Sequence, residues 1–398
     1  MSGPLEGLRV LDIATIVAAP FAATLLADYG AEVLKVELPG TGDGGRGVSP
    51  FKDGKSLWWK VTNRNKKFVI LDLRKPEGVE ILKRLLPRFD VLIENFRPGT
   101  LDRWGLSKEA LWAIQPRLVI LRATGFGQTG PYRNRPGFAR IFEAMSGLTA
   151  ITGEPDGEPM HAGYPVGDAV GGLFGALGVL AACWKRARDP QAPGEEIDLS
   201  LTEATLRILE FLAIEYDQLG AVRGRTGNAN AYSAPSAVYR TGDGRWVTLS
   251  GSTNAAYANN CRAIGRPDLI EDPRFASNGL RVENARELNA IFAAWCAGRT
   301  QEEVLAAFAR AGGTIAPVYT TDQVFADPQM QAREAITSVP DPDFGSVRMQ
   351  NVVPRFANDP ARVRVPGGAM GQDNEEIYGR WLGLSDEERR RLAEAGAI

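Results

Sequence analysis

Histidine and cysteine are scarce in this 398-residue chain, and their scarcity excludes several classes of catalytic site. The single histidine, His161, cannot form a His-rich metal site or an HExxH motif, and Ser–His–Asp catalysis would have to run through it alone. The three cysteines lie far apart without a CxxC pair, which excludes a disulfide framework and a Cys-based zinc site. This sparse use of cysteine suits a reducing cytosol, and we expect no metal cofactor.

The chain also lacks an excess of charge of either sign and a long hydrophobic run. Its 46 Lys and Arg residues nearly balance 48 Asp and Glu residues, which argues against binding nucleic acid through bulk electrostatics. No cationic stretch followed by an apolar core and a cleavage site opens the sequence. The longest uncharged run, Ala169–Trp184, is glycine-rich and shorter than the ~20 residues that span a bilayer. We therefore expect a buried helix there and a cytoplasmic protein without membrane partners.

Short apolar runs alternate with amphipathic helical stretches over the first 125 residues. Gly30 is expected to stop a helix over Phe21–Tyr29, Pro76 to open one that ends near Leu86, and Ser107 to cap one that ends near Ile114. Such alternation predicts an α/β fold with a mainly parallel sheet covered by helices on both faces. The expected strands are Leu8–Ile13, Val33–Leu38, Phe68–Leu73, Asp90–Glu94 and Arg117–Arg122.

A second, smaller unit is expected after the polar, glycine-rich segment Gly220–Tyr232. Beyond it, a GDG turn joins two short β-type runs, which predicts a hairpin, and helical patterns follow. This block, residues 230–315, is interpreted as a small α+β domain. The further expected elements are helices Arg140–Leu148, Glu203–Leu219 and Ser385–Ala395, the hairpin strands Ala237–Tyr239 and Trp246–Ser250, and a strand pair around Val347–Phe356.

A glycine pattern at residues 40–45 matches GxGxxG but sits in the wrong context for a dinucleotide site. That fingerprint follows the first strand and opens a helix. Here the pattern follows the second expected strand and continues into Arg46-Gly-Val-Ser-Pro, so we interpret it as a loop. Arg46 beside it remains a candidate contact for an anionic group.

Asp168 is the most informative single position, because it stands where a glycine-rich loop meets a small-residue helix. The simplest interpretation is a helix N-cap, a position that aspartate favours. The functional interpretation adds that the helix dipole and free amides would hold the carboxylate ionised. An ionised carboxylate in a glycine-lined pocket can attack an activated carbonyl carbon. Both interpretations remain open on this evidence.

The loops that follow the expected strands form a second group of candidate residues. Ligands of doubly wound sheets bind beyond the carboxyl ends of the strands, which here are Thr15–Pro20, Arg74 and Asn95–Gly99, with Arg103 close behind. Arginines at such ends suit phosphate groups, and Phe96 could pack against a base or an acyl chain. The alternative is that these are solvated loop arginines and a core phenylalanine.

Motifs in a fixed order along most of the chain resemble one known family, the family III CoA-transferases, which includes formyl-CoA transferase, carnitine CoA-transferase and the bile-acid-inducible F group. The resemblance is densest over residues 5–215. The motifs are LRVLD (8–12), APF (19–21), GAEVLKVE (30–37), NRNKK (63–67), LDL (71–73), ENFRPG (94–99), GFGQTGPY (125–132), AMSGL (144–148), GD (167–168) and DPRF (272–275).

The resemblance implies a fold, a reaction and a set of residues. It implies a Rossmann-like large domain built from residues 1–220 and 330–398, a small inserted domain, and two interlocked subunits in a homodimer. The implied enzyme moves CoA from an acyl-CoA thioester to a free carboxylic acid through an aspartyl anhydride and an enzyme–CoA thioester, without a metal. Asp168 matches the catalytic aspartate. The implied CoA contacts are Ile16, Val17, Ala18, Leu71, Arg74, Asn95, Phe96, Thr100 and Arg103.

The related acyl-CoA racemases need a histidine where this chain has Phe138, so the base for their proton transfer is missing. A racemase and a non-catalytic CoA-binding protein stay as the alternatives. His161, in the loop before Asp168, is a candidate contributor to the pocket. Glycine amides in Gly125–Gly130 and near Gly251 are candidate oxyanion donors.

Arg140 stands where many of these transferases carry an aspartate. A guanidinium there could pair with a second carboxylate of the substrate. We therefore hypothesise a short dicarboxylate of succinyl, mesaconyl, citramalyl or itaconyl type as one partner. The alternative role for Arg140 is a surface or interface ion pair, and transfer within one diacid is also compatible with these residues.

Overall fold

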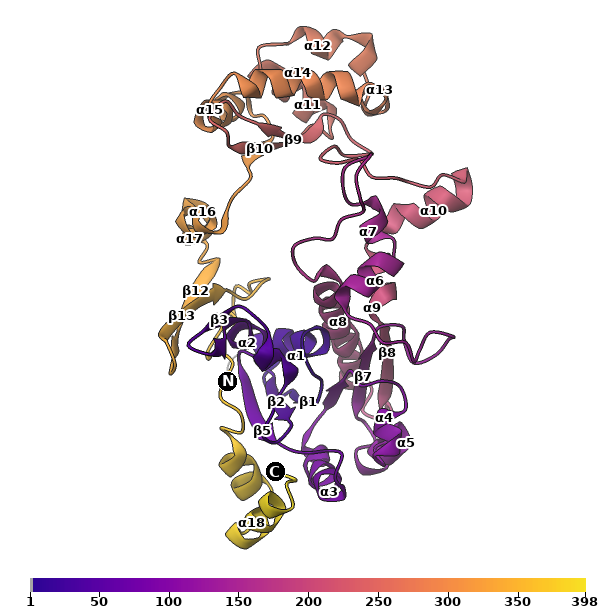
Figure 1. The fold of residues 1–398 in the computed structure, drawn as a ribbon, viewed down its shortest axis with the longest axis vertical. Helices are drawn as coiled ribbons and strands as arrows, with labels where there is room; N and C mark the ends of the chain where they lie inside the picture. Colours follow the sequence, from indigo (N-terminus) through magenta and orange to yellow (C-terminus); the bar gives the residue numbers. More distant parts are fainter. Residues whose placement is uncertain (1–2) are drawn as a thin grey trace. The chain divides into compact units, whose positions relative to one another are not determined.

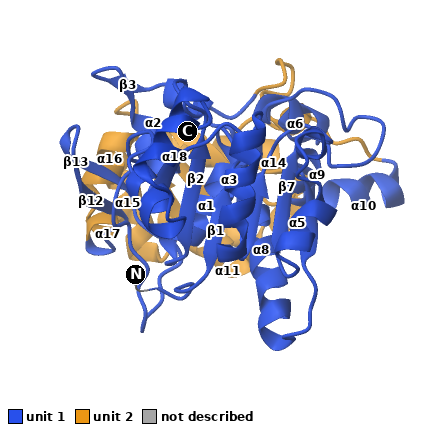
Figure 2. Ribbon diagram, turned by 90° about the horizontal axis from the view of Figure 1, so that it is seen from below, with its two compact units in different colours: residues 1–148, 161–220, 332–398 blue, residues 149–160, 221–331 orange. Residues whose placement is uncertain are grey.

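The computed structural model of the protein describes residues 3–398, and the chain divides into two compact units (Figure 2). Unit 1 comprises Met1–Leu148, His161–Gly220 and Ala332–Ile398, so both ends of the chain contribute to it. Unit 2 comprises Thr149–Met160 and Ala221–Gln331. The sequence predicts the first of these two segments as part of the large domain, whereas the structure places it in unit 2.

A six-stranded sheet in the order β5-β2-β1-β6-β7-β8 forms the centre of unit 1 (Figure 1). Every neighbouring pair in it is parallel, as the alternating sequence pattern predicts. The chain builds outward from β1 in one direction and then reverses to β6, which creates a topological switch point between these two strands. The strands are β1 (Arg9–Asp12), β2 (Glu32–Glu37), β5 (Lys66–Ile70), β6 (Val91–Glu94), β7 (Val119–Thr124) and β8 (Glu195–Ser200).

Helices cover both faces of this sheet, because successive strand residues point to opposite sides. Leu11 of β1 joins a core beneath α3 (Pro76–Leu85) and α5 (Lys108–Ile114), whereas its neighbour Val10 joins the core beneath α1 (Ala18–Asp28) and α8 (Val166–Arg188). The Ser107 hydroxyl accepts a hydrogen bond from Ala110 N, which confirms the predicted cap of α5. Strand β8 was missed because its EEIDLS sequence carries three acids and is only partly buried.

Helix α8 begins at Val166, three residues before the expected start at Ala169, so the N-cap interpretation of Asp168 is wrong. The aspartate lies in the first turn instead. With 23 residues, α8 is the one helix in the described part of the chain that is long and apolar enough to cross a membrane. It packs against α1 instead: a Cβ added at Gly172 would lie 2.9 Å from Ala18 O. This close approach explains the glycine there.

Other local boundaries differ from the expectations. The stretch expected as one helix over Glu203–Leu219 is broken at Ile208 and Leu209, and the expected strand pair lies earlier in the chain than Val347–Phe356. The remaining elements of unit 1 are β3 (Phe51–Lys52), β4 (Lys55–Ser56), α2 (Leu57–Thr62), α4 (Thr100–Arg103), α6 (Ala139–Met145), α9 (Leu201–Arg207), α10 (Glu210–Leu219), β12 (Ile336–Asp341), β13 (Gly345–Gln350) and α18 (Asp386–Glu394).

Unit 2 has its own antiparallel sheet and core. The predicted hairpin is present as β9 (Ser236–Arg240) and β10 (Trp246–Ser250), and β11 (Ile315–Pro317) pairs with the other edge of β10. Phe292 and Phe308 are fully buried in the core beneath these strands. The helices are α11 (Asn254–Ala263), α12 (Asp268–Glu271), α13 (Asn278–Glu283), α14 (Ala285–Ala297), α15 (Gln301–Ala311), α16 (Thr321–Ala326) and α17 (Pro328–Ala332), with α7 (Leu148–Ile151) at the boundary.

Candidate active site

A cavity of about 240 Å³ opens in unit 1 beyond the carboxyl ends of β1, β6 and β7. This is the crevice that the switch point of a doubly wound sheet leaves for a ligand. Residues from several segments line it: the loop after β1, the loop after β6, the end of β7, the loop of residues 133–138, α6, the first turn of α8 and the start of α9. The sequence-derived candidates that meet there are Ile16, Val17, Ala18, Asn95, Phe96 and Asp168.

Asp168 is partly buried in this cavity, and its protonation is set by burial rather than by the helix end. Burial first, and the negative charge of Glu143 second, raise the pKa of its carboxyl from 3.8 to about 6. The carboxylate accepts no hydrogen bond from any residue in 3–398, so the expectation that free amides hold it ionised is corrected. Above pH 6 the group is nevertheless an ionised oxygen nucleophile without a competing partner.

Glu143 of α6 contacts Gly167, the residue that precedes this aspartate. One carboxylate oxygen accepts a hydrogen bond from Gly167 N at 3.0 Å, and the other lies 3.0 Å from His161 Nδ1. His161 therefore does lie near the cavity, but as the partner of Glu143 and not among the lining residues. Sequence reasoning missed Glu143, although helical spacing places it on the same inward face as Ala139 and Phe142.

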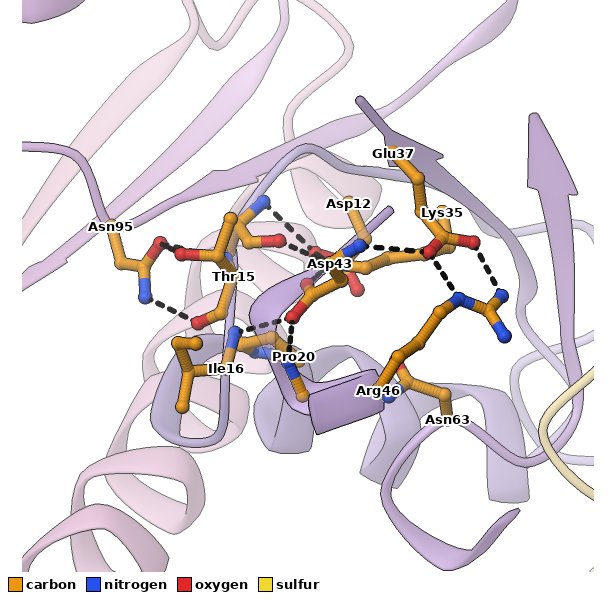
Figure 3. A network of polar contacts seen from close by, with 12 residues as sticks. Asp12, Thr15, Ile16, Pro20, Lys35, Glu37, Asp43, Arg46, Asn63 and Asn95 are labelled. Atoms are coloured by element: carbon orange, nitrogen blue, oxygen red, sulfur yellow. Dashed lines mark hydrogen bonds and ion pairs between the residues drawn. The ribbon is translucent and has the colours of Figure 1, made fainter. Parts of the chain in front are cut away.

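The loop after β1 is held from two sides (Figure 3). The Asn95 side chain accepts a hydrogen bond from Thr15 N at 2.8 Å and donates one to Thr15 O at 2.7 Å. On the other side, Asp43 Oδ1 accepts a hydrogen bond from Ile16 N at 3.0 Å. Ile16 has a φ of 70°, a left-handed conformation that a β-branched residue adopts only under constraint. The two clamps supply that constraint.

Buried ion pairs hold Asp43, the partner of Ile16, in place, and Figure 3 shows Asp43 with Lys35 and Asp12. Lys35 Nζ lies 2.8 Å from Asp43 Oδ2, and Lys66 Nζ lies 2.9 Å from Asp12 Oδ2. Lys66 also donates to Pro20 O at the start of α1. Burial is the largest influence on Lys66 and lowers its pKa to about 8. Because each buried charge is paired, this network holds the start of α1 beside the cavity.

The remaining implied CoA contacts lie outside this cavity. Arg103 borders a neighbouring polar cavity of about 350 Å³, which shares Pro98 and Arg133 with the first one. Its guanidinium donates to Thr100 Oγ1 at 3.0 Å. The Arg74 side chain is exposed and pairs with Asp72 at 2.8 Å, while the Leu71 side chain is buried in the hydrophobic core.

Two arginines predicted as anion contacts have different surroundings. Arg46 forms a two-pronged ion pair with Glu37, at 2.6 and 2.7 Å, and stacks 3.9 Å from the centre of the Trp59 ring. Arg46 lies within a single 3-10 turn, Gly44–Gly47. The glycine pattern therefore opens no longer helix, which agrees with its interpretation as a loop. Arg140 is exposed on α6 and does not line the cavity; Arg97, Arg133 and Arg135 do.

Of the two regions predicted to supply oxyanion donors, one borders the cavity and the other does not. Gly125 lines the cavity, and its carbonyl accepts a hydrogen bond from Thr202 Oγ1 at 2.8 Å, which fixes the turn after β7. The amide of Gly251 donates to Pro235 O at 2.7 Å within unit 2, so that donor is already engaged. Phe138, at the position where racemases need a histidine, is exposed and lines the cavity.

Comparisons with known proteins agree with this geometry. The family model of CoA-transferase family III matches residues 5–374. A succinyl-CoA–D-citramalate CoA-transferase from Chloroflexus aurantiacus is 43% identical over 391 residues, which cover 98% of this chain and 96% of that protein. The β subunit of a succinyl-CoA–L-malate CoA-transferase from the same organism is 40% identical over 389 residues, which cover 97% and 96%.

Mammalian relatives and solved structures point the same way. A succinyl-CoA:glutarate CoA-transferase from Mus musculus is 33% identical, over 99% of this chain and 90% of that protein. The crystal structure of a CAIB/BAIF family protein from Brucella suis superposes with a TM-score of 0.82 and 32% identity, over 96% of this chain and all of that one. This chain therefore belongs to CoA-transferase family III, as its ordered motifs indicated.

Proposed function

We propose that this enzyme transfers CoA from an acyl-CoA thioester to a free carboxylic acid, with Asp168 as the catalytic residue that carries first the acyl group and then CoA. The observation that carries the proposal is the place of Asp168 in the switch-point cavity, without a hydrogen-bond partner among residues 3–398. A carboxylate kept only for structure would be capped or paired, as Asp43 and Asp12 are.

The reaction proceeds through two covalent forms of the aspartate. An Asp168 oxygen attacks the thioester carbonyl, the C–S bond breaks, and a mixed anhydride and a CoA thiolate form. The thiolate then attacks the Asp168 carbonyl carbon, the donor acid leaves as a carboxylate, and an enzyme–CoA thioester remains. The acceptor carboxylate repeats both steps in reverse. Each step keeps the activated acyl bond that hydrolysis would destroy, provided that water is excluded.

The two adjoining cavities support a mode of CoA binding. Ile16, Val17, Ala18, Asn95 and Phe96 line the cavity of Asp168 and suit the thioester end of the pantetheine arm. The rim at Pro98 leads into the polar cavity of Arg103, where guanidinium groups suit phosphate. Thr100 orients that arginine, and we assign Leu71 and Arg74 to the same ligand through their family positions.

One reaction partner is proposed to be a short dicarboxylate of succinyl, mesaconyl, citramalyl or itaconyl type. The names of the most similar curated proteins, which pair succinyl-CoA with citramalate, malate or glutarate, support this choice. Arg140 is the candidate for the second carboxylate, because its guanidinium is exposed on the helix behind Asp168 and pairs with no acid among residues 3–398. His161 and Arg46 already hold Glu143 and Glu37, which leaves them supporting roles.

A cytoplasmic, interlocked homodimer is the proposed assembly. Helix α8 exposes Leu173, Leu177, Leu180 and Trp184 at helical spacing, although it belongs to the core of unit 1. A row of large apolar side chains on one face of a folded unit favours a partner surface over solvent. A second copy of this chain would bury these side chains in a dimer interface.

The deciding experiment is a CoA-transfer screen with succinyl-CoA and acetyl-CoA as donors against monocarboxylates and dicarboxylates. We expect transfer from succinyl-CoA to at least one dicarboxylate, and none after Asp168→Ala, which should still bind CoA. Full turnover by that variant would remove Asp168 from its role. Deuterium exchange at carbon 2 of an acyl-CoA without any acceptor acid would instead indicate the racemase alternative.

A further inference from the structure

The transfer steps assign no task to Glu143, a buried acid near the cavity. Glu143 is 2% exposed, yet neither the nucleophile nor a proposed CoA contact. It comes from α6, which packs beside the start of α8 (Figure 1). A second carboxylate close to Asp168 is electrostatically unfavourable, because like charges in a poorly solvated region repel. Its presence therefore suggests a functional role.

The contacts of Glu143 fix its charge in one place relative to Asp168. Its Oε1 accepts the hydrogen bond from Gly167 N, the amide that directly precedes the nucleophile, at 3.0 Å. Gly167 also packs closely: a Cβ built there would lie 3.4 Å from Glu143 Cγ and from Ala139 O. His161 Nδ1 holds Oε2 at 3.0 Å. With both oxygens engaged, the carboxylate cannot swing away from the first turn of α8.

Other ionisable groups lie near Asp168 in the chain or line the same cavity. Tyr164 and His161 precede α8 in the chain, and Arg97, Arg133 and Arg135 line the cavity. Of all these groups, only Glu143 has a resolved electrostatic influence on the pKa of Asp168, and that influence raises it. Glu143 is therefore the charged group with a resolved influence on this carboxylate.

We propose that Glu143 is a positioning residue whose fixed negative charge drives Asp168 from its ionised form toward its acylated forms. The proposal rests on the role of Asp168 given above. In the anhydride and in the CoA thioester, the aspartate no longer carries a charge. The electron pair and its charge have left with the CoA thiolate in the first step and with the donor carboxylate in the second. Acylation therefore relieves the repulsion from Glu143.

This reasoning links two measurable quantities. Protonation and thioester formation both remove the charge of Asp168, so Glu143 favours both by nearly the same free energy. Removing the charge of Glu143 should lower the pKa of Asp168 and should reduce the equilibrium ratio of enzyme–CoA thioester to free enzyme. Each unit of the first shift corresponds to a tenfold change in the second.

Glu143→Gln is the appropriate variant, because its amide oxygen still accepts the hydrogen bond from Gly167 N while the charge is lost. The acid limb of the kcat/KM profile should move below its wild-type midpoint near pH 6. The ratio of enzyme–CoA thioester to free enzyme would be measured by intact-protein mass spectrometry at fixed acyl-CoA and acid concentrations. It should fall tenfold for each unit by which the pKa of Asp168 falls. The KM for acyl-CoA should change by less than about twofold, because Glu143 does not line the cavity.

Glu80→Gln serves as the matched control, because it removes an exposed acid of α3 that pairs only with Lys83 at 2.8 Å among the described residues. It should leave both quantities unchanged. Glu143→Ala also removes the hydrogen bond to Gly167 N and should lose more kcat than Glu143→Gln. That additional loss separates the hydrogen bond from the charge.

A folded Glu143→Gln enzyme with an unmoved acid limb and an unmoved thioester ratio would overturn the proposal. If that variant does not fold, His161→Gln provides the test, because it keeps the charge of Glu143 and a hydrogen-bond donor to it. Its acid limb should stay in place or move upward, and a downward shift would overturn the proposal. Failure of Asp168→Ala to abolish transfer would instead refute the proposed function, so the two failures are distinguishable.

Discussion

Replacing Asp168, the proposed nucleophile, should make the protein more stable, and the effect should have a defined pH dependence. The pKa of Asp168 is raised from 3.8 to about 6, chiefly by burial and then by Glu143. Between these two values the folded protein holds a proton that the unfolded chain has released. Stability therefore falls as the pH rises from about 4 to 6, and above pH 6 the folded state carries the full cost of the ionised group.

The size of this cost follows from the size of the shift. A difference of about two pKa units corresponds to ~3 kcal/mol at 1.36 kcal/mol per unit. This is an upper limit for Asp168→Asn, because the buried amide also loses hydration. The variant should match the wild type in stability near pH 4 and should exceed it by up to ~3 kcal/mol at pH 8, at the expense of all transfer activity.

Urea titrations of both proteins at pH 4, 5, 6, 7 and 8 would measure the difference. A gain that develops between pH 4 and 6 and then levels off is the expected result. Parallel stability curves for the two proteins, with no pH-dependent difference, would refute the assignment of a raised pKa to Asp168. Asp102→Asn, which changes an acid at the other, polar cavity, is the matched control and should show no such gain.

Three further changes test other parts of the structure. Asn95→Ala removes both hydrogen bonds to Thr15 and should cost about 1–3 kcal/mol of stability while raising the KM for acyl-CoA more than it lowers kcat, in steady-state assays; an unchanged KM would contradict the clamp. Arg140→Ala should raise the acceptor KM far more for dicarboxylates than for monocarboxylates, and an equal rise for both would contradict its proposed role. Leu177→Glu places a charge on the exposed face of α8 and should convert the proposed dimer to monomers in light-scattering measurements; a wild-type mass would place the interface elsewhere.

Much of unit 1 could be predicted because its strands are short apolar runs buried on both faces. β1, β2, β5, β6 and β7 have this pattern, and the helices between them carry local stop and cap signals such as Gly30, Pro76 and Ser107. β8 lacks the pattern, because it is the edge strand beside β7 and its residues before Ser200 remain at least partly exposed. Its place in the sheet depends on pairing, which no local signal records.

The same distinction separates the parts of the site that could and could not be predicted. The place of Asp168 and of the loops after β1 and β6 at one cavity could be predicted, because strand ends and a helix start are visible in sequence. Glu143 reaches Gly167 across 24 residues, and Asp43 reaches Ile16 across 27. Such contacts arise only when separate elements pack, so spacing within one element does not reveal them. The burial that raises the pKa of Asp168 likewise follows from this packing and is not visible in the residues around it.

Covalent attachment of CoA to Asp168 is the most direct measurement of the proposed chemistry. The enzyme would be mixed with acyl-CoA in the absence of acceptor, quenched, digested and examined by peptide mass spectrometry, with and without hydroxylamine. We expect a hydroxylamine-sensitive CoA adduct on the peptide that contains Asp168, and none in Asp168→Ala. An adduct on another residue, or rapid transfer with no adduct at any time, would contradict an aspartate that carries the group between the two acids.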